Sequence, residues 1–392
     1  MTISLSAVGA LKEICDEVKE YGEPANPALP KMLKGAYPAL KSGGAVTGFY
    51  GYGKSLVATL SSLAERASGK KAVVLAAYKL LEAEEGRVDV NELRASADIQ
   101  ADALDCDELR KWALKTLDMA PGRSQLDVSD RIEVKGSGFY RILWIVRRLL
   151  ESGYSFVVVD EFERIAANPT GYGFGDLREL VDKYFEMVDS WPTSGAGLTV
   201  PTTLWVFLDL QTKRRISPTF HLALNVTTQE LREFLKRKLS HIPKELEEVE
   251  PRNPGVVASL VREVKSYGAS RVLESRIEWL RKIAESYPKL LLKTRRALHA
   301  AYLAAWYMQN AYAEIPPHKL RAAAEKLGTD DPAEVLTAKK RRKPLLSKTT
   351  SGYVLTADAV GHLRRALTES EKQYELGLAE VAHTLRMELE IP

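Results

Sequence analysis

The sequence predicts an α/β fold in which helices cover a parallel sheet. Short apolar runs recur along the first 224 residues, and four of them are continuous, as strands buried on both faces of a sheet should be. Longer amphipathic segments with helical spacing lie between these runs. This alternation of strand and helix is typical of a parallel sheet.

The expected elements of this part follow in chain order. Helical spacing is present at residues 3–20 and returns at 55–67, 138–152 and 175–190. The segment 82–110 is rich in Asp and Glu, and we interpret it as a helical insertion or a solvated face. The expected strands are Ala45–Phe49, Lys71–Ala77, Ser155–Asp160, Thr203–Asp209 and Thr219–Leu224.

The character of the chain changes after Leu224. Residues 228–311 show helical patterns only, which predicts a helical subdomain, and Pro316-Pro317 marks a boundary beyond it. We therefore expect three domains, at 1–226, 227–312 and 313–392. The helices expected in the second domain are Gln229–Leu239, Pro254–Tyr267, Ser270–Ser286 and Tyr287–Ala311.

Composition narrows the class of protein. The net charge of +4 is too small to indicate nucleic-acid binding by itself. Cys15 and Cys106 are the only cysteines, so we expect neither a disulfide framework nor a zinc site, and a reducing cytoplasm fits. Early acidic residues argue against a signal peptide, and no apolar run reaches the length of about 18 residues that a membrane helix needs. Scarce Asn and Gln beside abundant Lys, Arg and Glu weakly indicate a thermophilic source.

A glycine-rich loop links the first expected strand to the first helix after it. Its spacing, Gly-x-x-x-x-Gly-Lys-Ser, is typical of loops whose backbone N–H groups surround phosphate oxygens. We expect Lys54 to reach the β- and γ-phosphates of ATP and the Ser55 hydroxyl to ligate Mg²⁺. The expected nucleotide contacts are Gly48, Phe49, Tyr50, Gly51, Tyr52, Gly53, Lys54, Ser55 and Leu56.

Two carboxylates end the strand Ser155–Asp160. Asp160 lies at the carboxyl end of the strand, where ligands bind in open α/β sheets, and it is expected to hold Mg²⁺. Glu161 follows it and is expected to orient and deprotonate the attacking water. Together with the glycine-rich loop, this pair predicts a hydrolytic site.

Polar and basic residues follow the expected strand Thr203–Asp209. Asp209, Gln211 and Thr212 are the candidates for positioning water against the γ-phosphate. Arg214 or Arg215 could neutralise transition-state charge at a neighbouring subunit's nucleotide; surface charge or DNA contact is the alternative.

A second basic segment lies in the helical region. Arg295 or Arg296 could fold over the nucleotide, or they could simply begin a basic helix.

In these motifs the chain resembles the AAA+ ATPases. The resemblance covers about residues 40–310 and rests on GFYGYGKS (48–55), VVVDE (157–161), TLWVFLDLQT (203–212), RRISPTFHLALNVTTQELREFLKRKL (214–239) and KLLLKTRRALHAAYLAAW (289–306). It implies strand order 5-1-4-3-2, nucleotide bound between the core and a helical lid, and homo-oligomers in the ATP state. Archaeal origin-recognition/initiator-like ATPases are the most similar branch. The resemblance makes TLWVFLDLQT the sensor 1 strand, whose water-positioning residue is usually Asn, Thr or Ser. The chain departs from the family there, since the strand offers Asp209 with Gln211 and Thr212, and in the long 82–110 segment.

The C-terminal region resembles a winged helix. His318–Leu327 and Pro332–Arg341 would be helices, and Leu345–Lys348 and Tyr353–Thr356 would be the wing strands. Five consecutive cations stand where such domains contact phosphates, which predicts binding to double-stranded DNA. These cations are Lys339, Lys340, Arg341, Arg342 and Lys343.

The sequence thus predicts a DNA-associated AAA+ ATPase that binds and hydrolyses ATP with Mg²⁺ to control assembly on DNA or its remodelling. Replication initiation, mobile-element maintenance and genome defence all fit this function. The alternative is a nucleotide-dependent signalling or scaffold ATPase whose C-terminal domain docks a protein partner.

Overall fold

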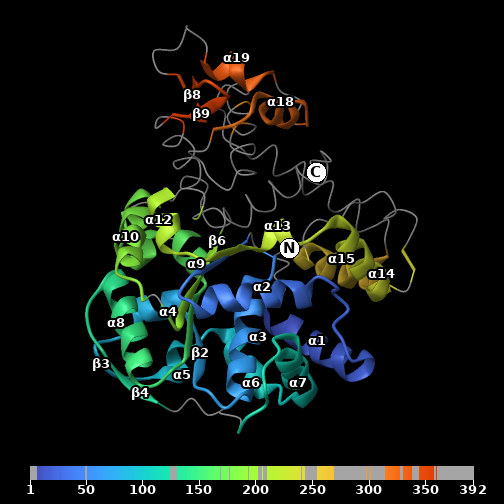
Figure 1. The fold of residues 1–392 in the computed structure, drawn as a ribbon, viewed down its shortest axis with the longest axis vertical. Helices are drawn as coiled ribbons and strands as arrows, with labels where there is room; N and C mark the ends of the chain where they lie inside the picture. The colour runs from blue at the N-terminus through green and yellow to red at the C-terminus, as the bar shows by residue number, and fades with distance from the viewer. Residues whose placement is uncertain are drawn as a thin grey trace.

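A five-stranded parallel sheet lies at the centre of the computed structural model (Figure 1). Every neighbouring pair in the sheet is parallel, so all five strands end at the same edge. The strands are β1 (Ala45–Gly48), β2 (Ala72–Ala76), β5 (Phe156–Asp160), β6 (Ala196–Pro201) and β7 (Thr219–His221).

The structure describes only part of the chain. The expected helices Ser270–Ser286 and Tyr287–Ala311 lie almost wholly outside the described residues. The described residues are 7–48, 51–123, 130–167, 169–175, 177–192, 194–201, 205, 210–239, 241–242, 254–268, 297, 301, 314–326, 330–337, 344–356 and 359.

The order of the strands corrects the expected labels. In the labels of Figure 1 the order across the sheet is β2-β5-β6-β1-β7, so the strand numbers differ from the expected 5-1-4-3-2. The labels shift because β3 (Gly86–Asp89) and β4 (Arg131–Val134) lie between β2 and β5 in the chain and pair with each other outside this sheet. Numbered among themselves in chain order, the five sheet strands run 2-3-4-1-5, so the first strand lies between the fourth and the fifth.

The fourth strand of the sheet was predicted in the wrong place. It is formed by β6, whereas the expected strand Thr203–Asp209 contains Trp205, whose backbone is helical, and is followed by α12 (Leu210–Arg215). A short apolar run does not by itself distinguish a strand from a helix, and the actual strand contains a glycine that weakened its pattern.

Helices cover both faces of the sheet, in three layers (Figure 1). Strand residues alternate between the two layers of core: Val74 and Val158 pack on one side, and Val73 and Val157 on the other. The first face carries α1 (Ala7–Tyr21), α2 (Leu29–Lys41), α3 (Lys54–Ala67), α6 (Ser96–Ala103) and α7 (Asp107–Thr116). The second face carries α4 (Ala77–Glu82), α8 (Gly138–Glu151), α9 (Phe162–Ala167) and α10 (Leu177–Asp189).

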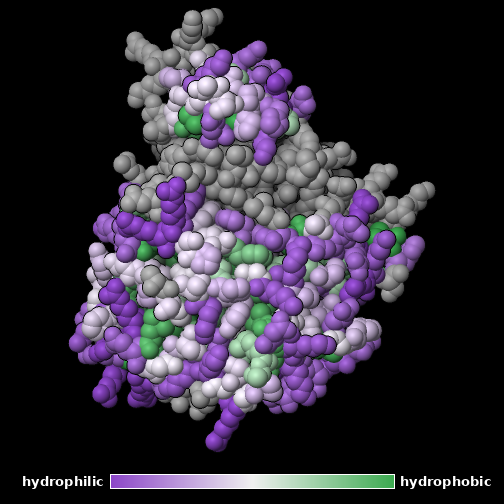
Figure 2. All heavy atoms as spheres, viewed as in Figure 1, coloured by the Kyte–Doolittle hydropathy of each residue, from purple (hydrophilic) through white to green (hydrophobic). Residues whose placement is uncertain are grey.

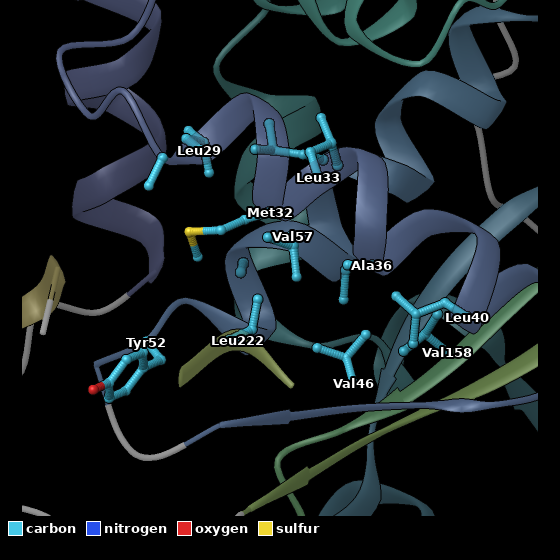
Figure 3. Close-up of a cluster of buried hydrophobic side chains, with 14 of the residues drawn as sticks. Leu29, Met32, Leu33, Ala36, Leu40, Val46, Tyr52, Val57, Val158 and Leu222 are labelled. Atoms are coloured by element: carbon cyan, nitrogen blue, oxygen red, sulfur yellow. The ribbon is translucent and has the colours of Figure 1, made fainter. Parts of the chain in front are cut away.

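Helix α2 was not predicted, because a proline-rich stretch leads into it. Pro30 stands at its first turn, where a missing N–H costs no hydrogen bond. One face of the helix is fully buried against β1 and α3 (Figure 3). That face is formed by Leu29, Met32, Leu33, Ala36 and Leu40.

The acidic insertion is not a solvated face. It folds into α5 (Val90–Leu93), α6 and α7, and the Asp98 carboxylate within it is completely buried. Arg66 Nη1 lies 3.0 Å from Asp98 Oδ1, and Arg94 Nε lies 2.9 Å from Asp98 Oδ2. The insertion also docks on β2, since Ala95 N–H donates to the Val74 carbonyl (2.9 Å) and Val74 N–H donates to Asp98 Oδ2 (3.3 Å).

The two cysteines correct a second expectation. Cys15 on α1 and Cys106 at the start of α7 form a disulfide across a sequence separation of 91 residues. Both side chains are buried, where α1 packs beside α7. Their distance in the sequence concealed this pairing, because only the fold brings the two helices together.

Two further helices lie beside the first layer, at the right of Figure 1. α14 (Thr228–Leu239) and α15 (Pro254–Tyr267) follow the short helix α13 (Leu222–Asn225) and correspond to the first two helices expected after Leu224. They pack together through an apolar cluster of their own, formed by Leu231, Phe234, Leu235, Val257, Leu260 and Val261.

The described C-terminal residues form two helices and a hairpin, at the top of Figure 1. These are α18 (Pro317–Lys326), α19 (Pro332–Thr337) and the antiparallel pair β8 (Leu346–Lys348) and β9 (Tyr353–Leu355). Ile315 adds an antiparallel bridge to Tyr353. The expected helix Pro332–Arg341 corresponds to α19, and its last four residues lie outside the described residues.

Hydrophilic residues predominate on the coloured part of the face seen in Figure 2. Among the described residues, no helix has the length and apolarity required to cross a membrane.

Candidate functional site

The glycine-rich loop turns the chain from β1 into α3. Gly51 and Gly53 have φ angles of 82° and 89°, and Gly53 is the N-cap of the helix. Such left-handed backbone favours glycine, and it allows a strand to turn into a helix within a few residues. Lys54 is the first residue of α3 and is buried, and Ser55 and Leu56 follow it, half-buried. Phe49 and Tyr50 lie outside the described residues.

The loop rests on packed side chains. Tyr52 is 1% exposed and contributes to the same core as Met32 of α2 and Leu222 of α13 (Figure 3). A Cβ atom on Gly48 would lie 3.2 Å from the Cβ of Tyr52, which is tighter than ordinary contact. A glycine at residue 48 therefore lets the loop fold back closely on its own strand.

Helix α15 touches the loop directly. The Gly255 N–H donates to the Gly51 carbonyl at 2.9 Å. A Cβ atom on Gly255 would lie only 2.7 Å from Gly51 Cα, so this approach requires a glycine. The helical region thus contacts the loop through two backbones.

Asp160 lies on the same side of the sheet as α3. It ends β5, and Val158 and Phe156, two and four residues before it, pack on the first face. Because side chains alternate along a strand, Asp160 also faces the α3 layer. Its side chain is completely buried, and the Thr199 hydroxyl of β6 donates to its Oδ1. The predicted carboxylate and the predicted loop therefore share one edge and one face of the sheet.

Strand registers give the relative heights of these groups. Val159 pairs with Leu198, and Leu198 pairs with Ala45. One residue further on, Asp160 and Thr199 are level with Val46, so Gly48 and the loop begin two residues beyond the carboxylate.

Glu161 stands at the turn between β5 and α9. Its φ of 65° is unusual for a residue with a side chain, and such strained backbone is concentrated at functional sites. The Glu161 carboxylate lies 3.4 Å from Arg164, whose guanidinium lies 3.7 Å from the Tyr78 ring centroid. The net pKa of Arg164 is raised: burial lowers it, but the interactions with Tyr78 and Glu161 outweigh burial.

A histidine and a threonine meet at the carboxyl ends of β7 and β1. Thr47 Oγ1 lies 2.7 Å from His221 Nδ1, and the Trp205 ring meets the imidazole edge-on at 5.8 Å between centroids. The Lys213 ammonium lies over the Trp205 ring, 5.7 Å from its centroid. Burial, assisted by the charge of Lys213, lowers the pKa of His221, so this histidine is neutral at pH 7.

The remaining predicted residues are placed as follows. Arg214 is exposed, and Arg215 forms an ion pair with Asp189 of α10. Neither arginine is brought to the loop by a contact within the described residues. The other predicted residues lie outside the described residues: Asp209, Arg295, Arg296, Lys339, Lys340, Arg341, Arg342 and Lys343.

A cavity of about 440 Å³ lies on the second face, away from the loop. It opens between α8, α10 and the 3₁₀ turn η1 (Pro169–Tyr172). Its walls combine aromatic rings with carboxylates, chiefly Phe139, Tyr140, Tyr172, Phe174, Glu179 and Glu186.

Sequence reasoning missed three contacts of this site: the Thr199 hydroxyl, the Gly255 backbone and the Arg164 guanidinium. Thr199 was hidden because its strand was predicted at residues 203–209. Arg164 alone had a visible signal, since it lies three residues after Glu161, the spacing of neighbours on a helix.

No protein-family model matches the chain, and no curated protein sequence matches it.

Proposed function

We propose that the protein is a P-loop ATPase that binds ATP at the Gly48–Leu56 loop and hydrolyses it. One observation carries the proposal: a glycine loop with Lys54 and Ser55 opening α3 lies at the same edge and on the same face of a parallel sheet as the Asp160 carboxylate that ends β5. Ligands of open α/β sheets bind at this edge.

Each residue has a distinct role in the proposed reaction. Backbone N–H groups of the loop and the N-terminus of α3 bind the phosphates, and Lys54 adds a positive charge. Glu161 orients a water molecule toward the γ-phosphorus and accepts its proton as the water oxygen attacks. The bond to the β–γ bridging oxygen breaks, which releases ADP and inorganic phosphate.

The donor set fits Mg²⁺, which prefers oxygen ligands and usually binds with substrate phosphates and water. The Ser55 hydroxyl and the Asp160 carboxylate would hold it. Among the described residues no group of three His, Cys, Asp or Glu side chains forms a metal cage. When bound, the ion would neutralise charge that develops on the phosphate oxygens.

Within the P-loop ATPases we propose an AAA+ arrangement. Three features support it: a strand between β1 and β5, the packing of α14 with α15, and the contact of α15 with the loop. In this proposal the nucleotide binds between the sheet and these helices, and an arginine of a neighbouring subunit, Arg214 or Arg215, completes the site in the ATP state.

Two substitutions test the ATPase proposal. Lys54→Ala should lower ATP affinity by at least tenfold, because the phosphates lose a buried cation. Glu161→Gln should retain binding and reduce kcat by 10²-fold or more, because general-base catalysis contributes about 10²–10⁴-fold. Calorimetry and phosphate release measure the two effects.

Glu151→Gln is the matched control for Glu161→Gln. It also removes an i,i+3 ion pair with an arginine, 2.7 Å from Arg148, but on the far end of α8. Its kcat should equal that of the wild type. A wild-type protein that neither binds nor hydrolyses ATP with Mg²⁺ would overturn the proposal.

We further propose that residues 313–392 bind double-stranded DNA as a winged helix. α18 packs with α19, α19 packs with β8, and the Lys339–Lys343 run follows α19. Replacing all five cations by alanine should reduce the slope of log affinity against log salt by up to about 4.5, since each phosphate contact contributes about 0.9. Fluorescence anisotropy with a DNA duplex measures this slope. Wild-type protein that binds no duplex with ATP at low salt would contradict the DNA role and leave the ATPase proposal intact.

A further inference from the structure

A buried side-chain hydrogen bond joins β6 to β5 at the candidate site. Thr199 and Asp160 are both completely buried, and the threonine Oγ1 donates to Asp160 Oδ1. Every other buried side chain of β6 that joins the core is apolar: Ala196, Leu198 and Val200. A hydroxyl at this position therefore departs from the pattern of its own strand.

The position of Thr199 is set by the sheet. Leu198 and Val200 face the second layer, so Thr199 faces the first, as Asp160 does. β6 lies between β1 and β5, which places the hydroxyl between the loop strand and the carboxylate strand. Both residues belong to the parallel sheet, where Thr199 pairs with Val46 and Asp160 pairs with Ala76.

We propose that Thr199 is a positioning residue for the metal site. Its hydroxyl fixes the orientation of the Asp160 carboxylate, so that the carboxylate is already aimed at the Mg²⁺ that accompanies ATP. This inference rests on the proposed ATPase function. Partners that orient a metal ligand commonly contribute 10–100-fold to metal affinity.

The test compares Thr199→Val with the wild type. Valine keeps the shape of threonine and removes the hydroxyl. Mn²⁺ replaces Mg²⁺ as the probe, and its binding to the complex with a non-hydrolysable ATP analogue is measured from the free-Mn²⁺ electron paramagnetic resonance signal. We expect Thr199→Val to weaken Mn²⁺ binding 10–100-fold. Binding of the same analogue in EDTA should stay within about twofold, since Thr199 does not touch the nucleotide in this proposal.

Two further variants separate positioning from packing. Thr199→Ser retains the hydroxyl and should bind Mn²⁺ within a few-fold of the wild type. Thr59→Val is the matched control, because Thr59 on α3 is equally buried and its hydroxyl has no hydrogen-bond partner among the described residues. Its Mn²⁺ binding should be unchanged. If Thr199→Val does not fold, Thr199→Ala takes its place with the same expectations.

A double-mutant cycle of Thr199→Val with Asp160→Asn tests whether Thr199 affects Mn²⁺ binding through the Asp160 carboxylate. If Thr199 acts through the carboxylate, Thr199→Val should change Mn²⁺ binding less than twofold in the Asp160→Asn background. Wild-type Mn²⁺ affinity in Thr199→Val would overturn the inference while the ATPase proposal stands. A wild-type protein that binds no analogue, with or without Mn²⁺, would overturn both.

Discussion

At the scale of single residues, a network of buried charges lies at the end of α3 opposite the loop. Asp98 is shared by two guanidiniums, those of Arg66 and Arg94, and Arg66 also pairs with Asp102 at 3.0 Å. Arg66 belongs to α3, so the network connects the helix that follows the loop to the insertion. Removing one member of such a buried network leaves an uncompensated charge, which costs more than the pair itself contributes.

Asp98→Asn should therefore lower the free energy of unfolding by about 3–5 kcal/mol. Urea denaturation followed by circular dichroism measures the change. Asp107→Asn is the control, because its carboxylate is 69% exposed and pairs with Arg110 at 2.7 Å on the surface; it should cost less than about 1 kcal/mol. Equal effects of the two substitutions would contradict a buried role for Asp98.

Acid should act through the same carboxylate. Burial alone raises the pKa of Asp98, but Arg66 and Arg94 outweigh it, and the net pKa lies below the ordinary value. The stability that the ionised group contributes is thus present above the unfolded pKa, about 3.9, and is lost as the pH falls through the lower folded value. Below about pH 4, the unfolding free energy of the wild type should fall more steeply than that of Asp98→Asn. If the unfolding free energies of the wild type and Asp98→Asn fell in parallel with pH, the Asp98 carboxylate would not be the cause of the acid sensitivity.

At the scale of elements, the sequence predicted those strands and helices whose positions are determined by a local hydrophobic pattern. Strands β1, β2 and β5 and helices α3, α8 and α15 lie where their patterns placed them. Asp160 and the glycine loop could be predicted because strand ends and glycine spacing are local properties. Thr199 could not, because its contact depends on which strands are neighbours. The disulfide and the buried Asp98 escaped prediction for the same reason.

The contact between α15 and the loop should be sensitive to a single added methyl group at Gly255. Gly255→Ala would place a Cβ atom 2.8 Å from the Gly51 carbonyl oxygen, so the helix or the loop must shift. We expect ATP affinity to change at least fivefold while the unfolding free energy falls by less than about 3 kcal/mol. Calorimetry measures the ATP affinity, and urea denaturation measures the free energy of unfolding.

Gly175→Ala is the control for Gly255→Ala. The added Cβ would meet only the flexible Glu179 carboxylate, at 2.9 Å, and not a backbone. ATP affinity should remain at the wild-type value. Identical ATP affinities in Gly255→Ala and Gly175→Ala would show that the contact of α15 with the loop does not affect nucleotide binding.

At the scale of the whole molecule, the N-terminal helices α1 and α2 join the first layer to the α14–α15 pair. Lys238 of α14 lies 2.9 Å from Glu13 of α1, and Lys31 of α2 lies 3.1 Å from Glu230 of α14. The Cys15–Cys106 disulfide then ties α1 to α7, which packs on α3. A continuous path of contacts thus runs from the α14–α15 pair through α1 to the helix that begins at Lys54.

Loss of the disulfide should lower the unfolding free energy of the whole chain by about 2–4 kcal/mol, because the bond closes a long loop in the unfolded state. Cys15→Ser measured by urea denaturation tests this. A reducing agent should shift the wild type by the same amount and leave Cys15→Ser unchanged. A wild-type curve insensitive to reduction would contradict the disulfide's contribution.

The docking of the insertion on β2 also has a consequence for how copies of this chain meet. An uncovered border strand offers unpaired N–H and C=O groups to any other extended chain. Here the Val74 carbonyl accepts from Ala95 and the Val74 N–H donates to the Asp98 carboxylate, so that border is already occupied. Weakening the insertion should therefore do more than destabilise the monomer: it should open the sheet to edge-to-edge polymerisation. Light scattering from Asp98→Asn should rise before its circular dichroism is lost.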